Sequence, residues 1–277
     1  MHLSLTILAF LVASVVYGQT PSTQVYGFRH IVFRYQSENV DVLVKSRTGD
    51  EDVRKPLFFF CQGSLPVPLI LRQDGVAFGT FPFDPDSLAV TYHVVIVGKP
   101  SVPLVADVSD LQPNYAYVDS TGDFPRGYTA NNVVGYYVSR NIAILRYLRT
   151  QPWVAPAPLV VAGHSEGSTI ALRMADAYKR ITHLVYSGGN PMGRMLSIIQ
   201  QERSRETDTD STRYGEEAFR YWSEVVSSRA EPGAAQSGAE ATMYGFSESL
   251  LPIFDRLTIP ILVTYGTRDW AAPYVDY

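Results

Sequence analysis

The stretch V-V-A-G-H-S-E-G-S, residues 160–168, organises the rest of the chain. It begins within an apolar, β-rich run (158–162) and continues into a run of small and apolar residues that suits a helix. A strand that turns sharply into a helix, with Ser165 at the apex, is the context that a G-x-S-x-G nucleophile elbow requires. Side chains two positions from such a strained residue are nearly excluded, which accounts for Gly163 and Gly167 as structural parts of the elbow. The alternative is a glycine-rich strand–helix turn with an ordinary serine.

Composition predicts one sizeable globular domain. The chain has 277 residues, of which 46% are hydrophobic and 18% are charged, and this is enough for a single core with an inserted subdomain. The formal net charge is −4 and no run of basic residues lies beside aromatic ones, so we expect no nucleic-acid partner. Cys61 is the only cysteine. It lies in an apolar run and is interpreted as a small buried hydrophobe rather than a reactive thiol.

The N-terminus predicts export. Residues 3–16 are uncharged and apolar, but they form a run too short for a comfortable membrane span. Together with the small residue that follows, they indicate a signal peptide over residues 1–18, cleaved near Gly18 and Gln19. We therefore expect a secreted or periplasmic protein without stable membrane insertion after cleavage. An uncleaved membrane anchor is the alternative.

The strand patterns predict an α/β fold with a mostly parallel central sheet. Residues 24–46 alternate between apolar and polar, as in an N-terminal antiparallel hairpin with one wet face. Apolar positions spaced by three and four residues predict an amphipathic helix over 131–150. Continuous apolar runs indicate strands that are buried on both faces. These runs are 56–61, 92–98, 158–162, 183–187 and 259–265.

The interval 190–256 contains helical patterns and no convincing strand. It is far longer than an ordinary crossover between two strands, so it predicts a helical lid insertion. Because buried strands alternate with helices on either side of this interval, residues 19–277 are expected to form a single domain with helices on both faces of the sheet.

An activated serine needs a base within hydrogen-bond reach and an acid that orients the base. Asp269 follows the buried run 259–265 and a Gly-Thr-Arg turn, and the order of serine before acid fits a catalytic triad. We predict that Ser165 is the nucleophile and Asp269 the triad acid. The alternative for Asp269 is that it only caps a turn.

Two backbone N–H groups are also needed to stabilise the oxyanion. One is predicted at Ser64, after the buried run 56–61, with Gly63 and Leu65 as alternatives, and the other at Glu166. The Glu166 side chain is expected to be solvated on the first helical turn. His164 precedes the nucleophile and has the wrong geometry for a base.

Three segments resemble the α/β-hydrolase fold superfamily: 58–64, 163–167 and 260–269. The resemblance looks closest to the secreted esterase-like and dienelactone-hydrolase-like branches. It implies a serine hydrolase that cleaves carboxylic esters, with thioesters and amides as further substrates, through an acyl-enzyme on Ser165. The implied partner is a small-molecule ester-type substrate. No metal-ligand cluster or cofactor motif is visible in the sequence, and hydrolysis by this route needs no cofactor.

The base of the triad is not visible. In this superfamily a histidine follows the acid after one further strand, whereas the sequence ends at Tyr277, eight residues after Asp269. The histidines at positions 2, 30, 93, 164 and 183 are interpreted as non-catalytic. We therefore expect that the last strand, the triad histidine and the final helix are missing and that the sequence is C-terminally incomplete. The alternative is a catalytically inactive binding protein with this fold. A peptidase or an acyltransferase is a third possibility, and the oligomeric state stays open.

Overall fold

The structure is a computed structural model that describes residues 23–207, 211, 213–231 and 233–276. The predicted signal peptide, residues 1–18, lies outside the described residues.

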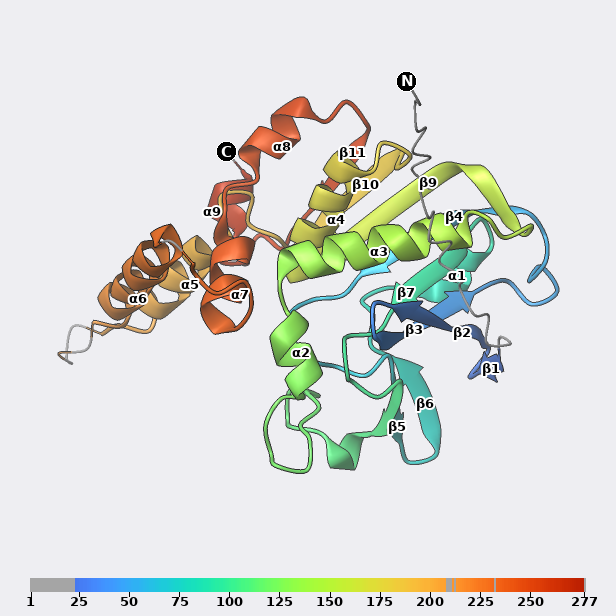
Figure 1. Cartoon of the computed structure of the whole chain (residues 1–277), viewed down its shortest axis with the longest axis horizontal. Coiled ribbons are helices and arrows are strands. Elements are labelled where there is room, and N and C mark those ends of the chain that lie inside the picture. The colour runs from blue at the N-terminus through green and yellow to red at the C-terminus, as the bar shows by residue number, and fades with distance from the viewer. Residues whose placement is uncertain (1–22, 208–210, 212, 232, 277) are drawn as a thin grey trace, which may run out of the picture.

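An eight-stranded sheet forms the centre of the molecule (Figure 1). Counted across the sheet, the first four strands pair antiparallel with one another. The fourth to the eighth strands pair in parallel. This arrangement confirms the predicted α/β class, the mostly parallel sheet and the N-terminal antiparallel hairpin. In spatial order the strands are β1 (Thr23–Val25), β2 (Phe28–Tyr35), β3 (Glu38–Lys45), β7 (His93–Val97), β4 (Lys55–Cys61), β9 (Val154–His164), β10 (His183–Ser187) and β11 (Ile261–Thr264).

Hydrophobic side chains cover both faces of this sheet. Successive side chains of a strand point to opposite faces, and those of β4 and β7 divide accordingly between two cores. Phe59 and Val95 belong to the core that also contains α3 (Val134–Leu148) and α4 (Glu166–Ala177). Phe60 and Ile96 belong to the other core, against which the short α1 (Pro85–Ala89) packs. The apolar runs of β4 and β7 reflect this burial on two sides. The predicted burial of 259–265 was wrong, because β11 is the edge strand of the sheet and its Leu262 and Val263 are exposed.

A second, three-stranded sheet was not predicted from the sequence. It consists of β5 (Ile70–Gln73), β6 (Val76–Gly79) and β8 (Val105–Asp107). Asp74 and Gly75 connect β5 to β6, and both have positive φ angles of 51° and 80°. Two positive φ values are typical of a type I′ turn, for which Asp-Gly is a preferred sequence. The turn signal was therefore present in the sequence, but the strands beside it are only four residues long.

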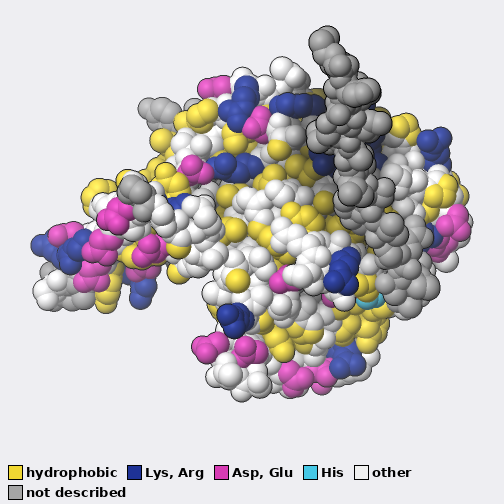
Figure 2. Space-filling view, viewed as in Figure 1, with side chains coloured by type: hydrophobic (Ala, Val, Ile, Leu, Met, Phe, Trp, Pro, Cys, Tyr) yellow, Lys and Arg dark blue, Asp and Glu magenta, His cyan; other side chains and the backbone are white. Residues whose placement is uncertain are grey.

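Helices fill the interval between β10 and β11, as predicted for 190–256. The described residues of that interval form α5 (Arg194–Arg203), α6 (Tyr214–Ala230), α7 (Ala239–Ser247) and α8 (Leu251–Arg256). The pair α5 and α6 projects from the body (Figure 1), and acidic and basic side chains intermingle on that projection (Figure 2). The remaining helices are α2 (Arg126–Asn131), α9 (Ala272–Val275) and the 3₁₀ helix Val108–Asp110.

Within the described ranges, no helix combines the length and the apolar character that crossing a membrane requires.

Candidate active site

Ser165 occupies the sharp turn between β9 and α4. Its φ of 54° and ψ of −123° are rare for a residue with a side chain, and such a backbone conformation costs roughly 1–3 kcal/mol. Hydrogen bonds on both sides hold it in place. The Ser165 N–H donates to the carbonyl oxygen of Ser187 (2.8 Å), and the Ser165 carbonyl oxygen accepts from the Ser168 N–H (3.0 Å) and hydroxyl (2.6 Å). The surrounding structure thus forces an exposed serine into a strained apex.

The two glycines of the elbow lie where the strand and the helix approach most closely. A Cβ atom added to Gly163 would lie 1.9 Å from the carbonyl oxygen of Gly167. A Cβ atom added to Gly167 would lie 2.1 Å from the carbonyl oxygen of Cys61 in β4. Because both neighbours are backbone atoms, neither can move aside as a flexible side chain would. These contacts leave no room for a side chain at either position, which explains why both residues are glycine.

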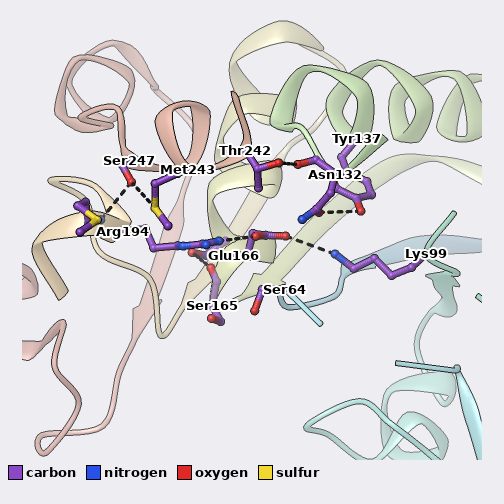
Figure 3. A network of polar contacts seen from close by, with 12 residues as sticks. Ser64, Lys99, Asn132, Tyr137, Ser165, Glu166, Arg194, Thr242, Met243 and Ser247 are labelled. Carbon is purple, nitrogen blue, oxygen red and sulfur yellow. Dashed lines mark hydrogen bonds and ion pairs between the residues drawn. The ribbon is translucent and has the colours of Figure 1, made fainter. Parts of the chain in front are cut away.

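The segment after β4 passes beside the nucleophile. A Cβ atom on Gly63 would lie 3.8 Å from the Cβ of Ser165, and Figure 3 shows the next residue, Ser64, beside Ser165. The carbonyl oxygen of Ser64 accepts a hydrogen bond from the Tyr128 hydroxyl, which fixes this turn. Glu166 is the first residue of α4, so its N–H has no acceptor within the helix. The structure therefore brings the predicted oxyanion donors to the same place, and their roles stay predictions.

Asp269 lines the same cavity as Ser165. It lies on the loop after β11, and its side chain is exposed. One carboxylate oxygen accepts a hydrogen bond from the N–H of Ala271 at 3.2 Å. Asp269 thus caps a turn, as the alternative interpretation expected, and also faces the cavity that a triad acid would have to face.

This cavity has a volume of about 190 Å³. The turns after β9 and β10 line it on one side, α5 supplies a polar wall, and two aromatic side chains, Phe246 and Trp270, also line it. The lining residues are Ser165, Glu166, Thr169, Gly188, Gly189, Asn190, Arg194, Ser197, Gln201, Phe246, Asp269, Trp270 and Ala271.

The side chain of Glu166 corrects one expectation. We expected a solvated side chain, but its relative exposure is 1%. Its Oε1 lies 3.4 Å from Nζ of Lys99, which is itself 3% exposed, and its Oε2 lies 2.7 Å from Nη1 of Arg194. Figure 3 shows the carboxylate between the two cations. Burial without a partner would be too costly for this carboxylate, so the two cations explain how it tolerates the interior.

Sequence reasoning missed Lys99 and Arg194. Lys99 follows β7, Glu166 follows β9, and Arg194 follows β10 after a short loop. The carboxyl ends of parallel strands meet at one edge of a sheet. Charged residues that follow the strands of a parallel sheet could therefore have indicated a charge cluster at this edge, even though the strands are far apart in the sequence.

Aromatic and amide groups complete the surroundings of Lys99. Its ammonium lies 4.5 Å from the ring centre of Tyr137, and the guanidinium of Arg140 lies 5.0 Å from the same ring. Arg140 is buried and donates to the carbonyl oxygen of Gly98 and to the side chain of Asn141. Burial lowers the pKa of Lys99, and the Glu166 carboxylate acts in the opposite direction. A cluster rich in positive charge thus lies beneath the elbow.

None of the four histidines in the described part of the chain lines this cavity. His164 is exposed, and its Nδ1 lies 3.1 Å from the hydroxyl of Ser187. His93 is fully buried among Ser46 and two backbone carbonyl oxygens, and this burial lowers its pKa. His30 bonds Asp41, and His183 lies beside Thr182.

Cys61 is buried, as predicted. Burial raises the pKa of its thiol to about 12, so the reactive thiolate is scarce at neutral pH. Across the described ranges, no group of three or more histidine, cysteine, aspartate and glutamate residues could hold a metal ion.

The fold and the elbow together define the α/β-hydrolase fold. A puromycin-hydrolyzing peptidase of Mycobacterium tuberculosis matches with a TM-score of 0.53 and 15% identity, over 90% of this chain and 32% of that one. An acylaminoacyl peptidase of Pyrococcus horikoshii matches with a TM-score of 0.50 and 12% identity, over 90% and 34%. This chain thus spans about a third of the length of these proteins, and identities this low show the fold alone. No protein-family model and no curated protein sequence matches the chain.

Proposed function

We propose that this chain is a serine hydrolase that cleaves carboxylic esters through an acyl-enzyme on Ser165. The observation that carries the proposal is the strained backbone of Ser165 at the apex between β9 and α4, with φ 54° and ψ −123°. Such strain persists only where the surrounding structure enforces it, and it clusters at functional sites. Thioesters and amides are further substrates within the same chemistry.

The proposed reaction has two halves. The Ser165 hydroxyl loses its proton to a general base as its oxygen attacks the carbonyl carbon, and the resulting oxyanion accepts hydrogen bonds from the N–H groups of Ser64 and Glu166. Collapse of this intermediate expels the alcohol, which takes up the proton, and leaves the acyl-enzyme. Water then attacks the acyl group in the same manner, which releases the acid and restores Ser165.

Asp269 is proposed to orient the general base. None of the described histidines lines the cavity, so none of them is proposed as that base. Added imidazole is expected to accelerate reactions of Ser165, because a small base can reach the exposed serine.

Covalent labelling tests the nucleophile. A fluorophosphonate probe is expected to modify the folded protein on the peptide that contains Ser165, as located by mass spectrometry, and to leave the Ser165→Ala variant unlabelled. Ester turnover, where measurable, should fall in that variant, by as much as roughly a millionfold where the general base is also in place. Ser223→Ala on the exposed α6 is the matched control and should label normally. Equal labelling of the Ser165→Ala variant would contradict the proposal.

A catalytically inactive binding protein is the second candidate, and the same placement of the histidines favours it. In that case the probe should leave the folded protein unmodified with and without imidazole, while small ligands still bind in the cavity. Labelling of Ser165 would exclude this candidate.

Export is proposed on the basis of residues 3–16, which are uncharged and apolar. The secreted or periplasmic protein is expected to begin near Gln19, because a signal peptidase cleaves after a small residue. N-terminal sequencing of protein recovered from the medium or periplasm checks this, and an intact Met1 in exported protein would contradict it.

A further inference from the structure

More positive than negative charge surrounds the elbow. The single carboxylate of Glu166 contacts two cations, Lys99 and Arg194. Lys99 is as deeply buried as Glu166, with exposures of 3% and 1%, and lies 3.4 Å from the carboxylate, whereas Arg194 lies 2.7 Å from it. Arg140 adds a further buried cation, whose guanidinium lies 5.0 Å from the centre of the Tyr137 ring. Two cations thus share the one negative charge of Glu166, and the group keeps a net positive charge.

Arg194 differs from the other cations because it faces the cavity. Its side chain is 32% exposed and lines the cavity together with Ser165. One guanidinium nitrogen donates to Glu166, and a guanidinium offers five donors in a rigid fork. Asp269 also lines the cavity, but it is exposed to solvent and accepts a hydrogen bond from a backbone N–H.

The rest of the α5 wall is polar as well. Arg194, Ser197 and Gln201 are spaced by three and four residues, which places them on one face of the helix, and all three line the cavity. The amide of Asn190, another lining residue, donates to the hydroxyl of Ser197 at 2.9 Å. This wall thus offers hydrogen-bond donors beside a positive charge, and its chemistry suits an anion better than an alkyl chain.

We infer that Ser165 acts on a small substrate that carries a carboxylate close to its scissile carbonyl group, and that Arg194 binds this carboxylate with Ser197 and Gln201. The inference rests on the proposed function. The cavity is small, with a volume of about 190 Å³, and one of its walls is polar, so it suits a short dicarboxylic half-ester.

Binding calorimetry with two amides of the same shape tests the inference without any chemical step. Succinamate carries a carboxylate and an amide carbonyl, whereas succinamide is its neutral analogue. The full chain is expected to bind succinamate about ten- to hundredfold more tightly, as for a charge-assisted hydrogen-bonded pair. Arg194→Gln should abolish this preference. Arg194→Lys, which keeps the charge but loses the fork, should retain part of it.

Arg173→Gln is the matched control, because Arg173 pairs with Glu248 at the surface and does not line the cavity. It removes the same charge and should leave the preference unchanged. Equal binding of the two amides to the unsubstituted chain, absence of binding by both, or a preference that survives Arg194→Gln would overturn the inference.

The two proposals fail separately. Fluorophosphonate labelling reports on Ser165 alone and uses a neutral probe, so its failure would remove the hydrolase and leave an anion-binding site. Normal labelling without a preference for succinamate would keep the hydrolase and remove the carboxylate specificity.

Discussion

Alanine at Gly167 is expected to lower the free energy of unfolding by at least about 3 kcal/mol. The added Cβ would lie 2.1 Å from the carbonyl oxygen of Cys61, so α4 would have to separate from β4 at the centre of the sheet. A loss of that size should lower the melting temperature by roughly 6–12 °C, at about 2–4 °C for each kcal/mol. Urea denaturation and scanning calorimetry measure both quantities.

Gly135→Ala provides the control for this substitution. Gly135 lies in α3, and no atom outside its neighbours lies within 4 Å of an added Cβ. Because alanine favours a helix over glycine, this variant should be unchanged or up to about 1 kcal/mol more stable. Equal stability of the Gly167→Ala and Gly135→Ala variants would show that the close contact at the elbow is not rigid.

Glu166→Gln is expected to cost about 3–5 kcal/mol of stability, because it leaves the buried ammonium of Lys99 without its counter-ion. Arg194, which is partly exposed, can be solvated in this variant, but Lys99 cannot. Glu248→Gln, which removes the carboxylate of a surface pair, should cost no more than about 1 kcal/mol. A small effect at Glu166 would mean that water or another group stabilises Lys99.

The stability lost in the Glu166→Gln variant should depend on pH. Burial lowers the pKa of Lys99 in the folded protein below the ordinary lysine value of 10.5. The unfolded state therefore binds more protons between that lowered value and 10.5, and stability rises with pH in this interval. Loss of Glu166 lowers the pKa further and widens the interval. The difference in stability between the two proteins should consequently be largest near neutral pH and shrink as the pH rises through the lowered pKa of Lys99, as denaturant titrations would measure.

The sequence predicted the central sheet because its inner strands are buried on both faces. Runs such as 56–61 and 92–98 are apolar throughout, and only a sheet covered on two sides requires this pattern. The small sheet of β5, β6 and β8 escaped prediction because its strands have three or four residues, too few for a clear alternation. Its Asp74–Gly75 turn was the one strong local signal.

The elbow could be predicted because strand, turn and helix follow one another directly in the sequence. The charge cluster was harder to predict, because Lys99, Glu166 and Arg194 come from three separate crossovers and meet only when the sheet forms. Their places after strands of the sheet were the one sign of it. A glutamate on a first helical turn is ordinarily solvated. Glu166 is buried instead because it pairs with Lys99, which follows β7 and is far from Glu166 in the sequence.

The nucleophile and the proposed anion-binding arginine belong to parts of the chain that can change independently. Ser165 sits on the sheet, whereas Arg194 begins a helix of the insertion between β10 and β11. Insertions on a rigid scaffold vary more readily than the scaffold does. Because Lys99 would still pair with Glu166, α5 could be exchanged during evolution, or grafted in the laboratory, to select another substrate while the reacting serine stays as it is.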